Sequence, residues 1–171
     1  MMQKSLDKPF WSLPSVHIPM PIEDVCRFPL LAECLEYWKA ASVEGLPKTI
    51  DPLELPRGLI KGVSLVDWSY ERGDWVLRLS SMLIDETQRL PMGGTWFSEI
   101  FEPDELATVH ARVRDIVQRG EADLARYEFM DTKSRVWSYV RLILPLSSDG
   151  VARDRYCLAM DPETFGKRVE D

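Results

Sequence analysis

The sequence contains few of the residues that mark a metal centre, a disulfide-stabilised domain or a membrane protein. It has 2 histidines and 3 cysteines among 171 residues. The odd number and wide spacing of Cys26, Cys34 and Cys157 fit neither a disulfide framework nor a zinc site. No apolar run approaches the ~20 residues needed to cross a bilayer, and the first 15 residues lack the apolar core of a signal peptide. We therefore expect a cytoplasmic protein with no membrane partner.

Positive charge is also scarce. The chain has 21 Lys and Arg against 28 Asp and Glu, a net charge of −7. An acidic chain without a clustered basic face repels a phosphate backbone, so we expect no nucleic-acid partner. The few histidines, the scattered carboxylates and the absence of a glycine-rich phosphate loop supply no acid–base pair or metal site. We therefore predict that the protein is not an enzyme.

Prolines are concentrated near the amino terminus, where five of the twelve fall between Pro9 and Pro29. Proline removes amide donors and restricts the preceding residue, so residues 1–29 are predicted to form an extended arm. Residues 30–62 follow as a leading helix, at 30–42, and a connector rich in Pro and Gly. The helix is predicted from apolar residues at helical spacing, namely Leu30, Leu31, Cys34, Leu35 and Trp38.

Residues 63–162 are predicted to form the body of the domain, followed by a polar tail at 163–171. The first two strands are joined by a tight turn, and the last three follow a long helix that begins at Pro103 and ends before Gly120. This order indicates an α+β fold, a five-stranded antiparallel sheet with helices on one face. The predicted strands are 63–70, 75–80, 124–130, 135–146 and 154–160, and the helical segments are 81–89, 96–101 and 103–119.

The longest predicted strand, 135–146, alternates with a period of two residues. One face carries Val136, Ser138, Val140, Leu142, Leu144 and Leu146. The other carries Arg135, Trp137, Tyr139, Arg141 and Ile143. We expect the aliphatic face to pack against the helices and the second face, with Arg141, to lie on the outside of the sheet.

This order of elements, together with four local motifs, resembles a PAS domain, and in particular the stand-alone single-PAS family found mainly in proteobacteria. The resemblance covers residues 30–162. One departure is that Ser81 and Met82 stand where that family has a Gly-Thr pair. The four motifs are EYWKAASVEGLPKTIDPLEL at 36–55, RLSSML at 78–83, GGTWFSEIF at 93–101 and LPLSSDG at 144–150.

The resemblance implies a bacterial sensory domain that binds a ligand between the sheet and the long helix. Either Arg78 or Arg141 could clamp a carboxylate or phosphate if its side chain points inward, although the alternation favours a surface role for Arg141. His17 is expected to be exposed. The alternative is that the same apolar residues simply fill the core. The candidate pocket residues are Arg78, Leu83, Trp96, Phe97, Ile100, Val109, His110, Val113, Leu142 and Met160.

The outer sheet face and the stripe on the leading helix form a candidate interface, because aromatic residues anchor such surfaces. The stripe either covers this outer face within one chain or reaches across to a second chain in a homodimer. The candidate interface residues are Leu31, Leu35, Trp38, Trp137, Tyr139 and Ile143.

No cofactor is required by the sequence. A flavin photosensor needs a cysteine on the helix before the long one, and no cysteine lies between Ser64 and Tyr156. A haem sensor commonly ligates iron from the long helix, and His110 borders the apolar face of that helix. The sequence therefore predicts a sensory domain that binds a small molecule or a signalling protein. The alternatives are a protein-interaction module whose core is filled by side chains, and a haem sensor.

Overall fold

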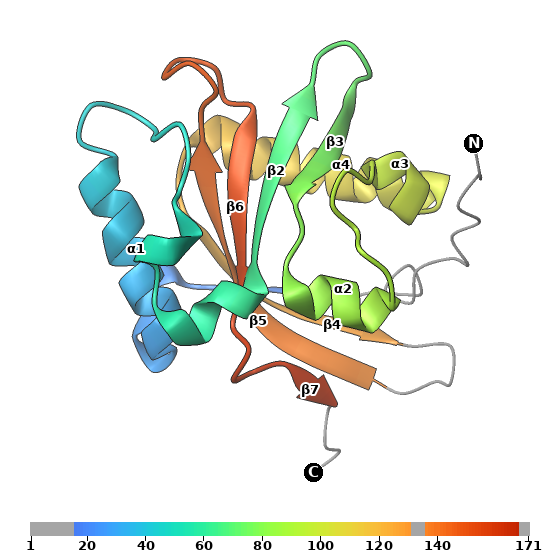
Figure 1. The fold of residues 1–171 in the computed structure, drawn as a ribbon, viewed down its shortest axis with the longest axis horizontal. Coiled ribbons are helices and arrows are strands. Elements are labelled where there is room, and N and C mark those ends of the chain that lie inside the picture. Colours follow the sequence, from blue (N-terminus) through green and yellow to red (C-terminus); the bar gives the residue numbers. More distant parts are fainter. Residues whose placement is uncertain (1–15, 131–135, 168–171) are drawn as a thin grey trace.

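A single antiparallel sheet organises the computed structural model, which describes residues 16–130 and 136–167 (Figure 1). The strand order is β1-β4-β5-β6-β2-β3, and β7 pairs with β5 beside this path. Two connections along this path cross the sheet: one from β1 to β2 through α1 and the 3-10 helices, and one from β3 to β4 through the other α-helices. The strands are β1 (Val16–Met20), β2 (Val63–Ser69), β3 (Asp74–Leu79), β4 (Asp123–Met130), β5 (Val136–Leu146), β6 (Arg155–Met160) and β7 (Gly166–Lys167).

Helices lie on both faces of the sheet. The α-helices are α1 (Pro29–Ala41), α2 (Met82–Gln88), α3 (Phe97–Ile100) and α4 (Pro103–Arg119). Short 3-10 helices occur at η2 (Ile22–Arg27), η3 (Pro52–Glu54) and η4 (Arg57–Gly62). The boundaries of α4 follow from its end residues, since Pro103 occupies its first turn and Gly120 ends it in the left-handed conformation, at φ 69°.

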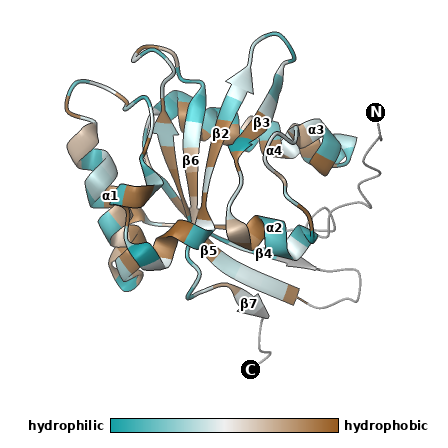
Figure 2. Cartoon of the chain, in the orientation of Figure 1, coloured by the Kyte–Doolittle hydropathy of each residue, from teal (hydrophilic) through white to brown (hydrophobic). Residues whose placement is uncertain are grey.

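A hydrophobic cluster lies on each face of the sheet. The strands between the two clusters carry the hydrophobic stretches visible in Figure 2. In the first cluster, α1 packs on Val140, Leu142 and Leu144 of β5. In the second, α2, α3 and α4 pack on Ile143 and its neighbours. Successive residues of a strand point to opposite faces, so both faces of β5 are buried.

All five predicted strands are present, within one residue of the predicted bounds. The α+β class is confirmed, with α2, α3 and α4 on one face as expected. The structure adds one feature to the predicted arrangement: the leading helix, α1, covers the opposite face of the sheet. The indole Nε1 of Trp38 donates a hydrogen bond to the carbonyl of Pro145, at 2.8 Å, which attaches α1 to β5.

The face assignment made from the alternation was wrong. The aliphatic side of β5, including Leu142, packs under α1, and the side with Tyr139, Arg141 and Ile143 faces α2, α3 and α4. A period of two shows that two faces differ but not which helices cover each. Because the sheet is covered on both faces, the less aliphatic side is not the outer side.

The predicted arm and tail also differ from the structure where it describes them. Residues 16–20 form the edge strand β1, which pairs with β4, and η2 follows it. An edge strand accommodates Pro19 because one side of its backbone needs no ladder partner. In the tail, β7 pairs with Trp137 and Ser138 of β5. Residues 1–15, 131–135 and 168–171 of the predicted arm, turn and tail lie outside the described residues.

The packing of α1 within the chain leads to a stability prediction. Leu31 is completely buried, so Leu31→Ala is expected to lower the free energy of unfolding by about 2–5 kcal/mol. Leu53, which is 83% exposed, is the matched control, and Leu53→Ala should change it by less than about 0.5 kcal/mol. Urea denaturation at several protein concentrations measures both effects. A dependence of the Leu31→Ala loss on concentration would show that α1 packs between two chains instead.

Candidate functional site

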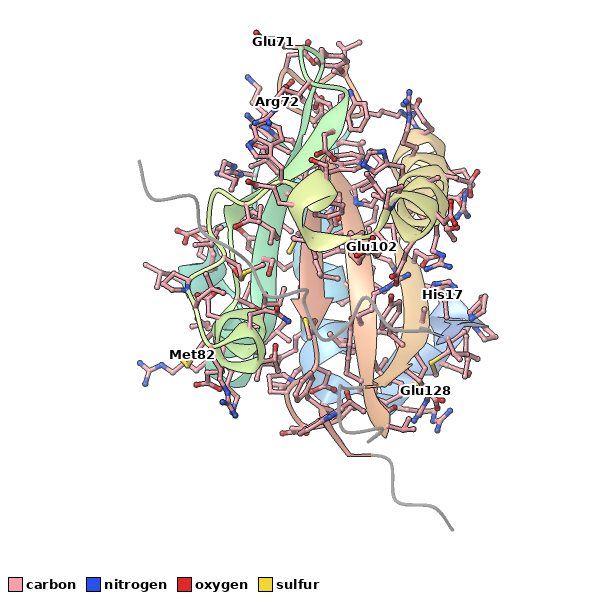
Figure 3. All side chains as sticks on the ribbon, turned by 90° about the vertical axis from the view of Figure 1, so that its right-hand side faces the viewer. His17, Glu71, Arg72, Met82, Glu102 and Glu128 are labelled. Atoms are coloured by element: carbon pink, nitrogen blue, oxygen red, sulfur yellow. The ribbon has the colours of Figure 1, made fainter. Side chains whose placement is uncertain are left out.

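A cavity of about 120 Å³ lies between the sheet and helices α2, α3 and α4. Figure 3 views the sheet from this side, with His17 beside β4. Aliphatic residues supplied by the sheet and by the helices, such as Ile143 and Val113, form much of the wall. The aromatic residues of the wall are Phe97, Phe101, Tyr127, Tyr139, Tyr156 and Phe165.

Aromatic rings form a continuous layer along part of the wall. Tyr127 on β4 packs against Tyr139 on β5, with centroids 5.6 Å apart, and Tyr139 packs against Phe165 at 5.8 Å. Burial raises the pKa of both Tyr139 and Tyr156, so their phenols stay neutral at physiological pH. The layer is therefore apolar and carries no negative charge of its own.

The polar end of the cavity is centred on Arg141 of β5. This side chain is almost fully buried, and its Nη1 donates to the Asp123 carboxylate at 2.7 Å and to the Asp123 carbonyl at 3.0 Å. Its Nη2 donates to Nε2 of His17 at 2.8 Å. A buried guanidinium requires such partners, because an unpaired charge in the interior is strongly destabilising.

His17 is held neutral in this position. The pKa of His17 is lowered from 6.5 to about 4, mainly because of burial and also because of the charges of Arg141 and Arg112, against the opposing effect of Asp123. The ring accepts a hydrogen bond at Nε2, so its proton resides on Nδ1. The expectation that His17 is exposed was wrong, because β1 brings it to the sheet edge beside β4.

Arg112 of α4 is the second guanidinium of the cavity wall. No carboxylate of residues 16–130 or 136–167 pairs with it. Asp123 is engaged by Arg141, and its other oxygen lies 3.8 Å from Arg119, which also pairs with Asp115. Among the described residues, the polar end therefore carries one guanidinium without a carboxylate partner, although the chain as a whole has a net charge of −7.

Five of the predicted pocket residues line the cavity. They come from α3, α4 and β6 and are Phe97, Ile100, Val109, Val113 and Met160. Leu83 belongs to the same hydrophobic cluster without lining the cavity, whereas Leu142 lies on the opposite face of the sheet. Their role in ligand binding stays a prediction.

The other predicted pocket residues are engaged elsewhere. Arg78 forms an ion pair with Asp67, at 3.0 Å, on the surface. The guanidinium of Arg72 stacks on Trp96, 3.9 Å from the ring centroid. Neither Arg78 nor Trp96 is among the residues that line the cavity.

His110 is part of a partly buried hydrogen-bond cluster and lies outside the cavity wall. Its Nε2 donates to Asp74 at 2.8 Å, and the same carboxylate accepts backbone N–H bonds from Trp75 and Ser98. Asp74 thereby joins β3, α3 and α4. A haem does not fit this arrangement, because the histidine is turned to a carboxylate and a cavity of about 120 Å³ is too small for a porphyrin.

The candidate interface residues are mostly buried within the chain. Leu31, Leu35 and Trp38 lie on α1 and belong to the first cluster, which includes residues of β5. Ile143 and Tyr139 line the cavity, and Trp137 is partly buried and stacks 5.9 Å from Phe165. The α1 stripe therefore packs within its own chain, as one of the two expectations had it, but on the aliphatic face of β5 rather than on the face with Trp137, Tyr139 and Ile143.

Ser81 and Met82, which replace the Gly-Thr pair of the resembling family, lie at the start of α2. The Ser81 hydroxyl accepts the N–H of Ile84 at 3.1 Å and caps the helix. Met82 is 56% exposed and lies outside the cavity wall. This departure therefore alters a helix cap rather than the shape of the cavity.

The cysteines take no part in the cavity. Cys34 and Cys157 are buried in the first cluster, as expected, and burial raises the pKa of the Cys34 thiol to about 12. Over residues 16–130 and 136–167, no group of three metal-ligating side chains occurs. Nor is any helix in those ranges long and apolar enough to cross a membrane.

The polar end of the cavity consists of His17, Arg112 and Arg141. Sequence reasoning considered Arg141 as an anion clamp but favoured the surface for it, and it missed His17 and Arg112. The alternation did place Arg141 on one face with Tyr139 and Ile143, and a charged residue among aromatics in a central strand is the signal that could have found it. His17 had no such signal, because its position depends on the pairing of β1 with β4.

Comparison with known proteins found no family model and no curated protein that matches the chain. Among solved structures, one described as "Structure of an RNA-binding Light-Oxygen-Voltage Receptor" aligns at 13% identity with a TM-score of 0.40. The alignment covers 90% of this chain and 39% of that chain, so the present chain corresponds to less than half of the receptor's length.

The element order defines the class of domain. The hairpin β2–β3, the helices α2 to α4 and the strands β4, β5 and β6 follow one another as in a PAS domain, and β2 lies beside β6 in the sheet. The fold is therefore PAS-like. Membership of the stand-alone single-PAS family stays a prediction.

The neutral state of His17 leads to a prediction about pH. The folded-state pKa of about 4 lies below the unfolded value of 6.5, so the unfolded chain binds the proton more readily. The stability contribution is complete above pH 6.5 and is lost as the pH falls through 4. As the pH falls from 6.5 to 4, the free energy of unfolding of the wild type should decrease by about 1–2 kcal/mol more than that of His17→Gln. This figure allows for solvent screening at a half-buried site. Urea denaturation across this range tests it, and parallel stability curves would contradict it.

Proposed function

We propose that this chain is a PAS-like sensory domain that binds a small molecule in the cavity between the sheet and α3 and α4. The observation that carries the proposal is the cavity itself, an apolar and aromatic wall with a small polar group at one end. Ligand sites in proteins have this composition, in which apolar walls supply affinity and a few polar groups fix the orientation. The proposed role is binding rather than catalysis.

The size of the cavity limits the ligand. An apolar cavity of about 150 Å³ holds a benzene molecule, so the cavity of about 120 Å³ suits a body of about one ring. The alternative of a filled core requires that the side chains around the cavity leave no space for a ligand between the sheet and the helices. The cavity supports the ligand-binding proposal over that alternative.

The position of the cavity also suits a sensor. Its wall is shared by the sheet, by α3 and by α4, which pack together through side chains rather than a common hydrogen-bond ladder. A ligand that prefers one arrangement of these elements shifts the population toward it. We propose that this shift is the signal, read by a partner protein.

Filling the cavity should separate ligand binding from folding. Val113 lines the cavity, whereas Val117, one turn along α4, is completely buried outside its wall. Val113→Phe is expected to change the free energy of unfolding by less than about 1 kcal/mol, because the new ring enters the open space of the cavity. Val117→Phe is expected to lower the free energy of unfolding by about 1–3 kcal/mol, because the new ring overpacks the core. Urea denaturation of both variants measures the difference.

The same variants test binding. Native mass spectrometry of freshly purified protein reports any retained small molecule, and NMR of the methyl groups reports the neutral one-ring probe 2-phenylacetamide. We expect the probe to shift the signals of Ile143 and Met160 in the wild type and not in Val113→Phe. No shift in the wild type, together with equal destabilisation by the two substitutions, would overturn the proposed function.

A further inference from the structure

The polar end of the cavity holds two guanidiniums that differ in their pairing. Arg141 has a complete set of protein partners, with Asp123 and His17 within hydrogen-bond distance. Arg112 lines the same cavity, and no carboxylate of the described residues pairs with it. One arginine therefore belongs to the framework, and the other is available to a ligand.

The charges around Arg112 favour an anion. His17, which feels the charge of both arginines, is neutral, and Asp123, the acid that acts on His17, is already shared between Arg141 and Arg119. Tyr139 and Tyr156 remain uncharged on the cavity wall. The polar end thus presents a single excess positive charge beside an apolar space of about 120 Å³.

We infer that the cavity takes a small monocarboxylate with an apolar body of about one ring, and that Arg112 is the residue that pairs with its carboxylate. This inference rests on the proposed function. A guanidinium binds a planar carboxylate through two parallel hydrogen bonds, and such charge-assisted bonds are about twice as strong as neutral ones. A phosphate monoester, with about two negative charges at pH 7, would exceed the single charge available.

The position of Arg112 supports the assignment. Arg112 adjoins Val113 and lies three residues after Val109 on α4, and both valines line the cavity. Residues three apart on a helix share a face, so the guanidinium side chain rises from the helix face that forms the apolar wall. A ligand whose ring contacts Val109 and Val113 has its carboxylate on the Arg112 side.

The test compares phenylacetate with its neutral isostere 2-phenylacetamide, by NMR titration of the wild-type chain at pH 7. The expected result is that phenylacetate binds at least about tenfold more tightly, because only the carboxylate makes charge-assisted bonds. Equal affinities, or tighter binding of the amide, would overturn the inference and leave the proposed function intact. Absence of binding by both probes would count against both.

Substitution of the arginine identifies the residue responsible. Arg112→Gln is expected to remove the preference for phenylacetate while leaving the affinity for phenylacetamide within about twofold, which also shows that the cavity remains folded. Arg114→Gln is the matched control, because Arg114 lies on the same helix but stacks on Trp68, 5.0 Å from the ring, outside the cavity. Loss of the preference in Arg114→Gln as well, or its persistence in Arg112→Gln, would overturn the assignment to Arg112.

Discussion

The burial of both faces of β5 is the constraint on which the rest of the structure depends. β5 pairs with β4 and β6 along its length, and consecutive residues alternate between α1 and the cavity. A shift of one residue in register would place Arg141 under α1 and Leu142 in the cavity. The aliphatic packing of α1 therefore also determines which side chains reach the cavity.

Burial of Arg141 in the sheet imposes the next requirement. A guanidinium with this little exposure needs partners, because an unpaired buried charge costs about 3–5 kcal/mol. Asp123 supplies the counter-charge from β4, and His17 supplies an uncharged acceptor from β1. The first described strand is thereby tied to the cavity wall through a side chain, in addition to its pairing with β4.

The helical side of the cavity has a comparable anchor. Asp74, at the start of β3, holds the first turn of α3 through Ser98 and the middle of α4 through His110. Trp68 packs edge-to-face on the same histidine. These two polar clusters join the elements around the cavity at a few points, and the rest of the packing there is largely apolar. A ligand that enters this space contacts elements whose relative positions are set by few polar bonds, which is the physical basis of the proposed sensory role.

Much of the fold follows from local sequence signals. Alternation predicts β5, apolar spacing predicts α1, and Pro103 and Gly120 mark the ends of α4, because strand period, helical stripe and end residues are properties of short segments. Phe97, Ile100, Val109, Val113 and Met160 were predicted to lie together for the same reason, since each lies on the apolar side of its element. Tertiary packing decided which face of β5 α1 covers, that Arg141 is buried, and that His17 meets it from a distant part of the chain. These outcomes depend on contacts between residues more than 100 positions apart, and the periodicity of a single segment carries no record of its partner.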